Sequence, residues 1–173
     1  MVTRLQFSGD VVKEIVESGF KNVFDSTVFS KRLSFYMLPH ILSDYGRPST
    51  VLLSTLAKPP SLQRGGDTGE FKIILLYPDQ GFAVQYTTNM HMQGQYVLGC
   101  PANSHVEFQL YSPDNGNSLV DLLPPSWQDA IKNQYKPIEE VASMTTEEFY
   151  QTFHEPSDNC IQTLASLWPV PEE

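Results

Sequence analysis

The stretch FKIILLYPDQGFAVQY, residues 71–86, constrains the fold more than any other part of the chain. Its first half is a run of aliphatic, β-branched and aromatic residues. Its second half alternates large apolar with small or polar residues, as a strand with one buried face does. Between the halves, residues 78–81 supply turn chemistry, because proline presets φ and glycine accepts positive φ. We therefore expect strands 71–77 and 82–87 to pair antiparallel at the centre of a sheet.

Shorter apolar or alternating runs predict the other strands of this sheet. They are residues 49–56, 96–100 and 105–111, with polar loops over 58–70 and 89–94. At the start of the chain, residues 2–7 and 11–17 flank a Ser-Gly-Asp turn and predict a hairpin, although helical spacing of the later valines leaves a helix as the alternative. We interpret residues 1–28 as this hairpin, the remnant of a preceding unit, and residues 29–173 as a single domain.

Two helices are predicted from their end signals. Residues 35–45 have Pro39 in the first turn and Gly46 after the last, where we expect the left-handed αL conformation. Residues 146–154 follow a capping box of Thr145 and Glu148 and carry an apolar face. A short irregular or helical piece is expected at 124–127, and Leu167 and Trp168 are expected to pin an otherwise irregular tail.

Together these elements predict an α+β domain. We expect an antiparallel sheet of about five strands, packed by one or two helices on one face and followed by an irregular C-terminal extension.

Composition restricts the partners. The chain has 20 acidic and only 11 scattered basic residues, for a net charge of −9. This argues against nucleic acid, which requires clustered cations, and against anionic membrane surfaces. No apolar run is long enough to span a bilayer, and residues 1–10 do not resemble a signal peptide. Another protein is the partner we expect.

The two cysteines, Cys100 and Cys160, have two interpretations. In a reducing cytosol they would be buried thiols. In an oxidising compartment they would close a loop of about 60 residues, which the chain-entropy model values at about 4 kcal/mol.

Catalytic and metal-binding signals are weak. Cys100 and His105 suggest a nucleophile pair only by local spacing, and Met90-His91-Met92 offers soft ligands without a closing fourth. We expect no catalytic residue, no cofactor and no metal site. Tyrosine is enriched at interfaces, so Tyr77, Tyr86 and Tyr96 are the candidates for a shared binding face.

The segment LSDYGRPSTVLL, residues 42–53, resembles the helix-to-sheet junction of SmpA/OmlA-like modules. These modules occur in small outer-membrane assembly lipoproteins and, as a tandem pair, in β-lactamase-inhibitor proteins. The hairpin YPDQGFAVQY, the late Cys160 and Trp168 are similar to features of uncharacterised bacterial lipoproteins with the same junction. The resemblance implies a helix-plus-antiparallel-sheet scaffold that binds other proteins and is not an enzyme. The signal and lipobox cysteine of such lipoproteins are not present, and no functional residue carries over.

We therefore expect a non-enzymatic, exported or envelope-associated protein-binding module, with export depending on an upstream signal. The alternative is a cytoplasmic binding or immunity-type protein with reduced cysteines. An enzyme without a recognisable motif is the third hypothesis, and a deep pocket with convergent polar groups would favour it.

Overall fold

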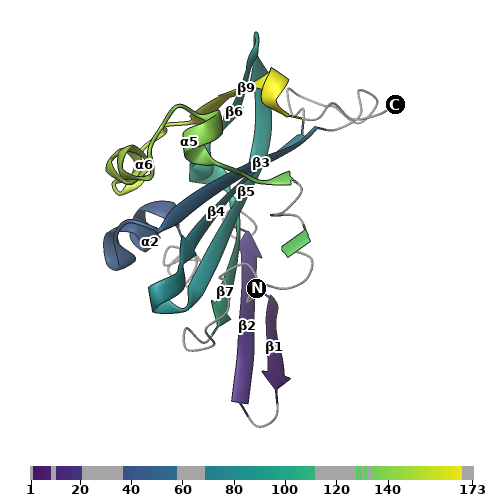
Figure 1. Cartoon of the computed structure of the whole chain (residues 1–173), viewed down its shortest axis with the longest axis vertical. Helices are drawn as coiled ribbons and strands as arrows, with labels where there is room; N and C mark the ends of the chain where they lie inside the picture. Colours follow the sequence, from purple (N-terminus) through teal and green to yellow (C-terminus); the bar gives the residue numbers. More distant parts are fainter. Residues whose placement is uncertain are drawn as a thin grey trace.

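The computed structural model shows an α+β chain built on one antiparallel sheet (Figure 1). It describes residues 2–8, 11–20, 37–57, 69–111, 128–129, 131 and 134–168, with the backbone alone for 2–20, 103 and 108–111. The strands are β1 (Val2–Ser8), β2 (Val11–Phe20), β3 (Thr50–Ala57), β4 (Gly69–Tyr77), β5 (Phe82–Gln93), β6 (Tyr96–Gly99), β7 (His105–Tyr111), β8 (Lys136–Pro137) and β9 (Ile161–Leu164). The helices are α2 (Leu38–Tyr45), α5 (Ile138–Val141) and α6 (Thr146–Phe153), with 3-10 turns η2 (Pro78–Gln80), η3 (Pro101–Asn103) and η5 (Ala165–Leu167).

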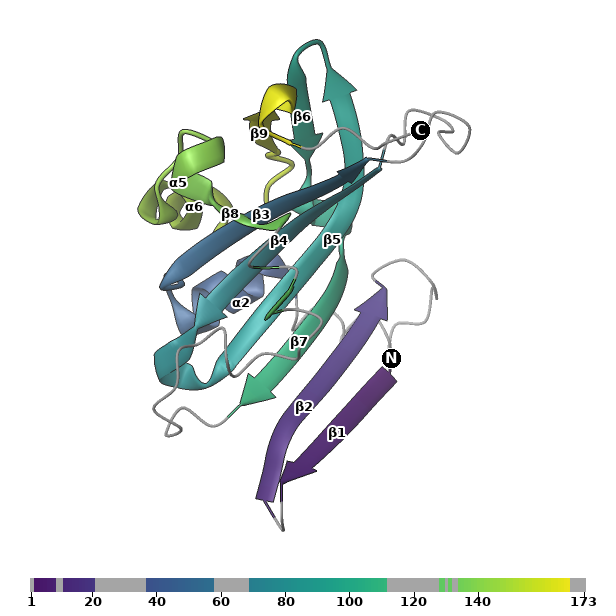
Figure 2. The ribbon, with the colours of Figure 1, turned by 45° about the vertical axis from the view of Figure 1, so that its right-hand side comes forward.

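Within the described residues the sheet has nine strands, where about five were expected. Its main order is β1-β2-β7-β5-β4-β3-β8, while β6 pairs with the far end of β5, and β9 pairs with β6. The expected hairpin at the start of the chain is present and joins this sheet, because β2 pairs along β7. Figure 2 shows the hairpin beside β7 at one end and the β5–β6 hairpin at the other.

The predicted central pairing is confirmed. In β4 and β5, Ile73 lies opposite Tyr86 and Leu75 opposite Val84, and all four side chains are buried. The turn between them is η2, closed by Gly81 in the αL region at φ 74° and ψ 33°. A glycine suits this position because other residues rarely adopt positive φ.

The loop predicted over residues 89–94 is wrong, because β5 continues to Gln93. Met90 is still buried and pairs with Gly99 of β6, so both the ladder and the core extend past the expected end. The chain reverses only at Gly94, which has φ 61°.

The strand next to β5 is interrupted. β6 and β7 both pair with the same side of β5, with Gly99 opposite Met90 and His105 opposite Thr87. Residues 100–104 therefore bulge out opposite only residues 88 and 89. Pro101 contributes to the break, because it has no N–H for the ladder. This interruption positions the candidate site.

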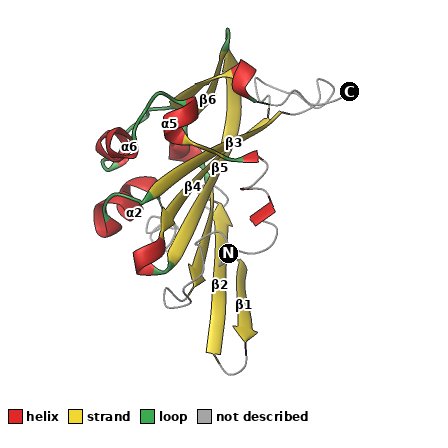
Figure 3. Cartoon of the chain, in the orientation of Figure 1, coloured by secondary structure: helices red, strands yellow, loops and turns green. Residues whose placement is uncertain are grey.

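The main core lies between the sheet and the helices, which gather on one side of it in Figures 1 and 3. It combines alternate residues of β3, β4 and β5 with Ile41 and Leu42 of α2, Ile138 of α5 and Phe149 of α6. The opposite face of the sheet has a smaller buried cluster, Leu52, Ile74, Leu76 and Ala83, against which Ile131 and Tyr135 pack.

The helix ends follow the sequence signals with one correction. Thr145 and Glu148 form the predicted capping box of α6, and Phe149 and Phe153 are buried. Gly46 ends α2 with positive φ, but its angles are φ 76° and ψ −159° rather than αL. That region is open essentially to glycine alone. The chain takes this conformation as it turns into β3, while the Tyr77 hydroxyl donates a hydrogen bond to the Gly46 carbonyl at 2.8 Å.

The tail is more regular than expected. Residues 161–164 form strand β9, which was not predicted, and Trp168 is buried. The Trp168 indole N–H donates to Thr163 Oγ1 at 2.8 Å, so the expected pinning of the tail is confirmed. The piece expected at 124–127 and most of the loop expected at 58–70 lie outside the described residues.

Candidate functional site

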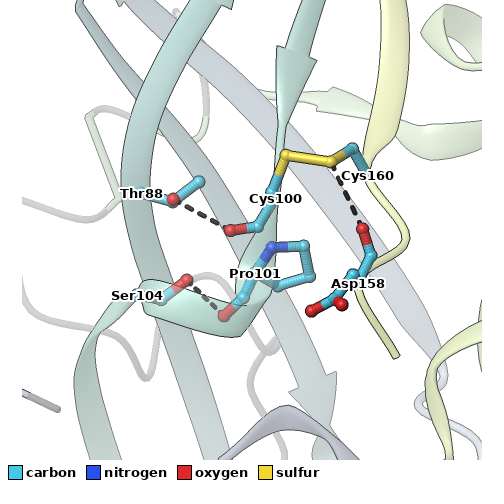
Figure 4. The surroundings of a disulfide bond; sticks show 6 residues. All are labelled: Thr88, Cys100, Pro101, Ser104, Asp158 and Cys160. Atoms are coloured by element: carbon cyan, nitrogen blue, oxygen red, sulfur yellow. Dashed lines mark hydrogen bonds between the residues drawn. A yellow bond between two sulfur atoms is a disulfide. The ribbon is translucent and has the colours of Figure 1, made fainter. Parts of the chain in front are cut away.

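A disulfide joins Cys100 to Cys160, with Cα atoms 4.1 Å apart (Figure 4). Because Gly99 pairs with Ile161 in the β6–β9 ladder, the two cysteines occupy the next cross-strand position beyond the ladder. The Cys100 carbonyl also accepts a hydrogen bond from Thr88 Oγ1 of β5 at 3.0 Å. Of the two interpretations of the cysteines, the structure shows the disulfide, and a disulfide is compatible with an extracellular location.

The bridge lies where two segments meet. After Cys100 comes the bulge, which is held by a 2.9 Å hydrogen bond from the buried Ser104 hydroxyl to the Pro101 carbonyl (Figure 4). Before Cys160 comes the chain leaving α6, and the Asp158 carbonyl lies 3.6 Å from Cys160 Sγ. The disulfide thus ties the bulge directly to residues 155–158.

These two segments enclose a cleft of about 350 Å³. Its floor is Tyr86 and Val106, which pair across β5 and β7, and the start of α2 and the end of α6 complete its walls. The lining residues are Met37, Leu38, Pro39, Tyr86, Pro101, Ala102, Ser104, Val106, Phe153, Glu155, Pro156, Ser157 and Asp158. Most are apolar, as in ordinary ligand sites, and the volume is at the small end of their range.

The polar groups of the cleft are acidic or neutral. Glu155 and Asp158 are exposed at its rim, and the lining residues that the structure describes include no lysine or arginine. His154 Nδ1 lies 3.1 Å from the Tyr150 carbonyl and 3.0 Å from the Gln151 carbonyl at the end of α6, which leaves Nε2 3.9 Å from Glu155. At the floor, burial raises the pKa of the Tyr86 hydroxyl well above 10.0, with a further contribution from Tyr77, so this hydroxyl is neutral.

The predicted tyrosine face is wrong for two of its three members. Tyr77 and Tyr86 are 2% and 0% exposed, because both side chains point to the helix-covered face of the sheet. Tyr77 stacks on Phe82 with ring centroids 4.5 Å apart. Tyr86 still contributes to the cleft, but as part of its floor.

Tyr96 is on the other face of the sheet. It is half-buried and lies opposite Leu164 of β9, which is 39% exposed, while Leu98 follows two residues later on the same face. Around them on β5 and β9 are His91, Gln93 and Gln162, all exposed. This part of the sheet is therefore an accessible surface, and its β5–β6–β9 ladder contains no Asp, Glu, Lys or Arg side chain.

Two weak chemical signals do not converge in the structure. The Cys100 sulfur is bonded to Cys160, so it is not a nucleophile for His105. Met90 is buried while His91 points to the opposite, exposed face of β5, so the Met-His-Met run does not form one ligand set. Within the described part of the chain, no three His, Cys, Asp or Glu side chains are grouped to hold a metal ion, and no helix there is long and apolar enough to cross a membrane.

Comparisons with protein-family models, with curated proteins and with solved structures find no match for this chain.

Proposed function

We propose that this chain is a non-enzymatic binding module of an extracytoplasmic or envelope compartment and that it binds another protein at the cleft beside the disulfide. The observation that carries the proposal is the construction of the cleft. Two of its walls are the segments that the Cys100–Cys160 bond joins, so the disulfide stabilises the candidate binding surface directly. A structural disulfide of this kind is typical of an oxidising compartment, which supports the proposed location.

The chemistry of the cleft supports binding more than catalysis. The Tyr86 hydroxyl is neutral, the Ser104 hydroxyl donates to a backbone carbonyl, and the two carboxylates are at the solvent-exposed rim. General acid–base work is usually done by groups whose pKa lies near the working pH. An apolar floor with a polar rim is instead the arrangement of a protein-recognition pocket.

The compartment and the binding site are tested separately. Source cells are quenched in acid, lysed in denaturant and treated with thiol-reactive polyethylene glycol, with and without prior reduction; both cysteines should be modified only after reduction. Free thiols in the native cell would reject the extracytoplasmic location and favour a cytoplasmic binding protein with reduced cysteines.

The site is tested with a photo-crosslinking residue at Pro156, which is exposed on the rim, and with a matched one at Glu140, which is exposed on α5 away from the cleft. A protein that crosslinks from position 156 but not from position 140, and not when Ala102→Trp fills the cleft, supports the proposal. Equal crosslinking from both positions, or persistence with the filled cleft, would reject the cleft as the binding site. A thermal melt must first show that Ala102→Trp folds; if it does not, Val106→Phe is the filling variant.

A further inference from the structure

The lining of the cleft also identifies the chemistry of its partner. We propose that the cleft takes an apolar side chain of the partner protein that is flanked by a lysine or arginine. This inference rests on the proposed function, because it names what the partner places in the same site.

The apolar part of the inference comes from the interior of the cleft. Val106 and the buried Tyr86 form the floor, and the buried Leu38 and Phe153 also line the cleft. The lining offers a polar group few hydrogen bonds, chiefly from the buried Ser157 hydroxyl, which has no partner among the described residues, whereas an apolar side chain gains from burial against the rest. The volume of about 350 Å³ is small for a cofactor and suits a few side-chain groups.

The cationic part comes from the rim. Glu155 is 82% exposed at its side chain, and Asp158 is exposed beside it, two residues before the disulfide. The described lysines and arginines with described side chains are occupied elsewhere: Arg47 pairs with Glu147 at 3.0 Å, Lys72 with Glu70 at 3.2 Å, and Lys136 donates to the Leu167 carbonyl at 2.7 Å. Among the described side chains, neither rim carboxylate is paired with a lysine or arginine, and each can accept a cation that arrives with the ligand.

Other charges at the cleft do not reverse this preference. The end of α6 contributes partial negative charge from its last carbonyls, and the start of α2 contributes partial positive charge of similar size. His154 lies 3.9 Å from Glu155, so it offsets that carboxylate only when protonated. Two full carboxylate charges remain, and electrostatic complementarity of this kind selects among partners more than it adds affinity.

The test uses two defined peptides on the oxidised, isotope-labelled protein. The probe is acetyl-Lys-Leu-Phe-Lys-amide, and its charge-reversed control is acetyl-Glu-Leu-Phe-Glu-amide. Backbone amide signals of Ala102, Ser104, Val106 and Ser157 are followed by NMR during titration. We expect the basic peptide to shift these signals and the acidic peptide to leave them unchanged.

A pair of charge variants completes the test. Glu155→Gln with Asp158→Asn should weaken binding of the basic peptide about 2- to 30-fold, the range for losing two exposed ion pairs. Glu140→Gln with Asp79→Asn removes the same charge at exposed positions outside the cleft and should change affinity less than 2-fold. Both sets change surface residues only, so folding is preserved.

The outcomes separate this inference from the proposed function. The charge preference would be overturned if both peptides bound the cleft equally. It would also be overturned if both pairs of variants lost the same amount of affinity for the basic peptide. Absence of amide shifts with either peptide, while crosslinking from position 156 still traps a partner, would overturn the inference and leave the proposed function standing. If neither peptide shifts the amide signals and no protein is crosslinked from position 156, both the inference and the proposed function are rejected.

Discussion

Removing the disulfide should destabilise the whole chain and open the cleft in particular. The change is Cys100→Ser together with Cys160→Ser, which deletes one covalent bond and adds two small hydroxyls. The cysteines are 60 residues apart in the chain. In the chain-entropy model, a loop of that length restricts the unfolded state by about 4 kcal/mol.

The structure indicates where this loss is felt. β9 has four residues and pairs only with β6 among the described strands, so the adjacent disulfide is its main tether besides Trp168 and the core contact of Ile161. Loss of the bond should therefore raise hydrogen exchange in β6 and β9 and in residues 155–158. The paired centre of β4 and β5 should lose protection only through global unfolding.

Denaturant unfolding of the parent and the double serine variant measures the effect. We expect the free energy of unfolding to fall by about 3–4 kcal/mol, since measured losses reach or lie below the entropic value. A reductant should produce a similar loss in the parent and none in the variant, which controls for effects on the other residues. A difference under about 1 kcal/mol between parent and variant would refute the idea that the bond constrains the unfolded chain.

Three further predictions concern other parts of the fold. Val84→Asp places a carboxylate in the fully buried centre of the sheet and should lower the free energy of unfolding by at least about 4 kcal/mol; a melting temperature within a degree or two of the parent would show that its assigned facing is wrong. Gly46→Asn should be as destabilising as Gly46→Val, because asparagine tolerates αL but not the backbone angles observed at Gly46. An asparagine variant that is clearly more stable than the valine variant in the same denaturation assay would contradict this. The backbone amide and hydroxyl of Thr145 lower the pKa of Glu148, so its charged form stabilises the fold above pH 4.5 and that contribution is lost as the pH falls through the lowered value. Glu148→Gln should keep the cap but flatten the decline in melting temperature between pH 5 and 3, and parallel declines would rule out this role.

Local patterns in the sequence predicted the elements that are long or have strong end signals. The alternation of β5, the apolar run of β4 and the capping box of α6 each satisfy one rule over several residues. β9 was missed because four residues carry too little periodicity, although Ile161 and Thr163 do alternate with exposed neighbours. What makes this segment a strand is pairing with β6 and the disulfide, which are long-range contacts.

The cleft could not be predicted for a related reason. Its lining comes from residues 37–39, 86, 101–106 and 153–158, which only the folded chain brings together. The local signals were the cysteines themselves and the prolines near them, Pro101 and Pro156. Proline breaks regular pairing, so a disulfide flanked by prolines indicates irregular backbone at both of its ends. Such a combination indicates a place where strand pairing is interrupted and where a cleft can form beside the sheet.

The tyrosines show which kind of sequence argument to prefer when two conflict. Residue type favoured an exposed face for Tyr86, because tyrosine is enriched at interfaces. Alternation placed Tyr86 on the same side as Phe82 and Val84, and the side that holds two large apolar residues is the buried one. By the same alternation, the side chain of Tyr96 points to the face opposite the buried Val97, and that face is the accessible one. Strand parity is enforced by backbone geometry at every residue, whereas residue preference is a statistical tendency, so parity decided both positions.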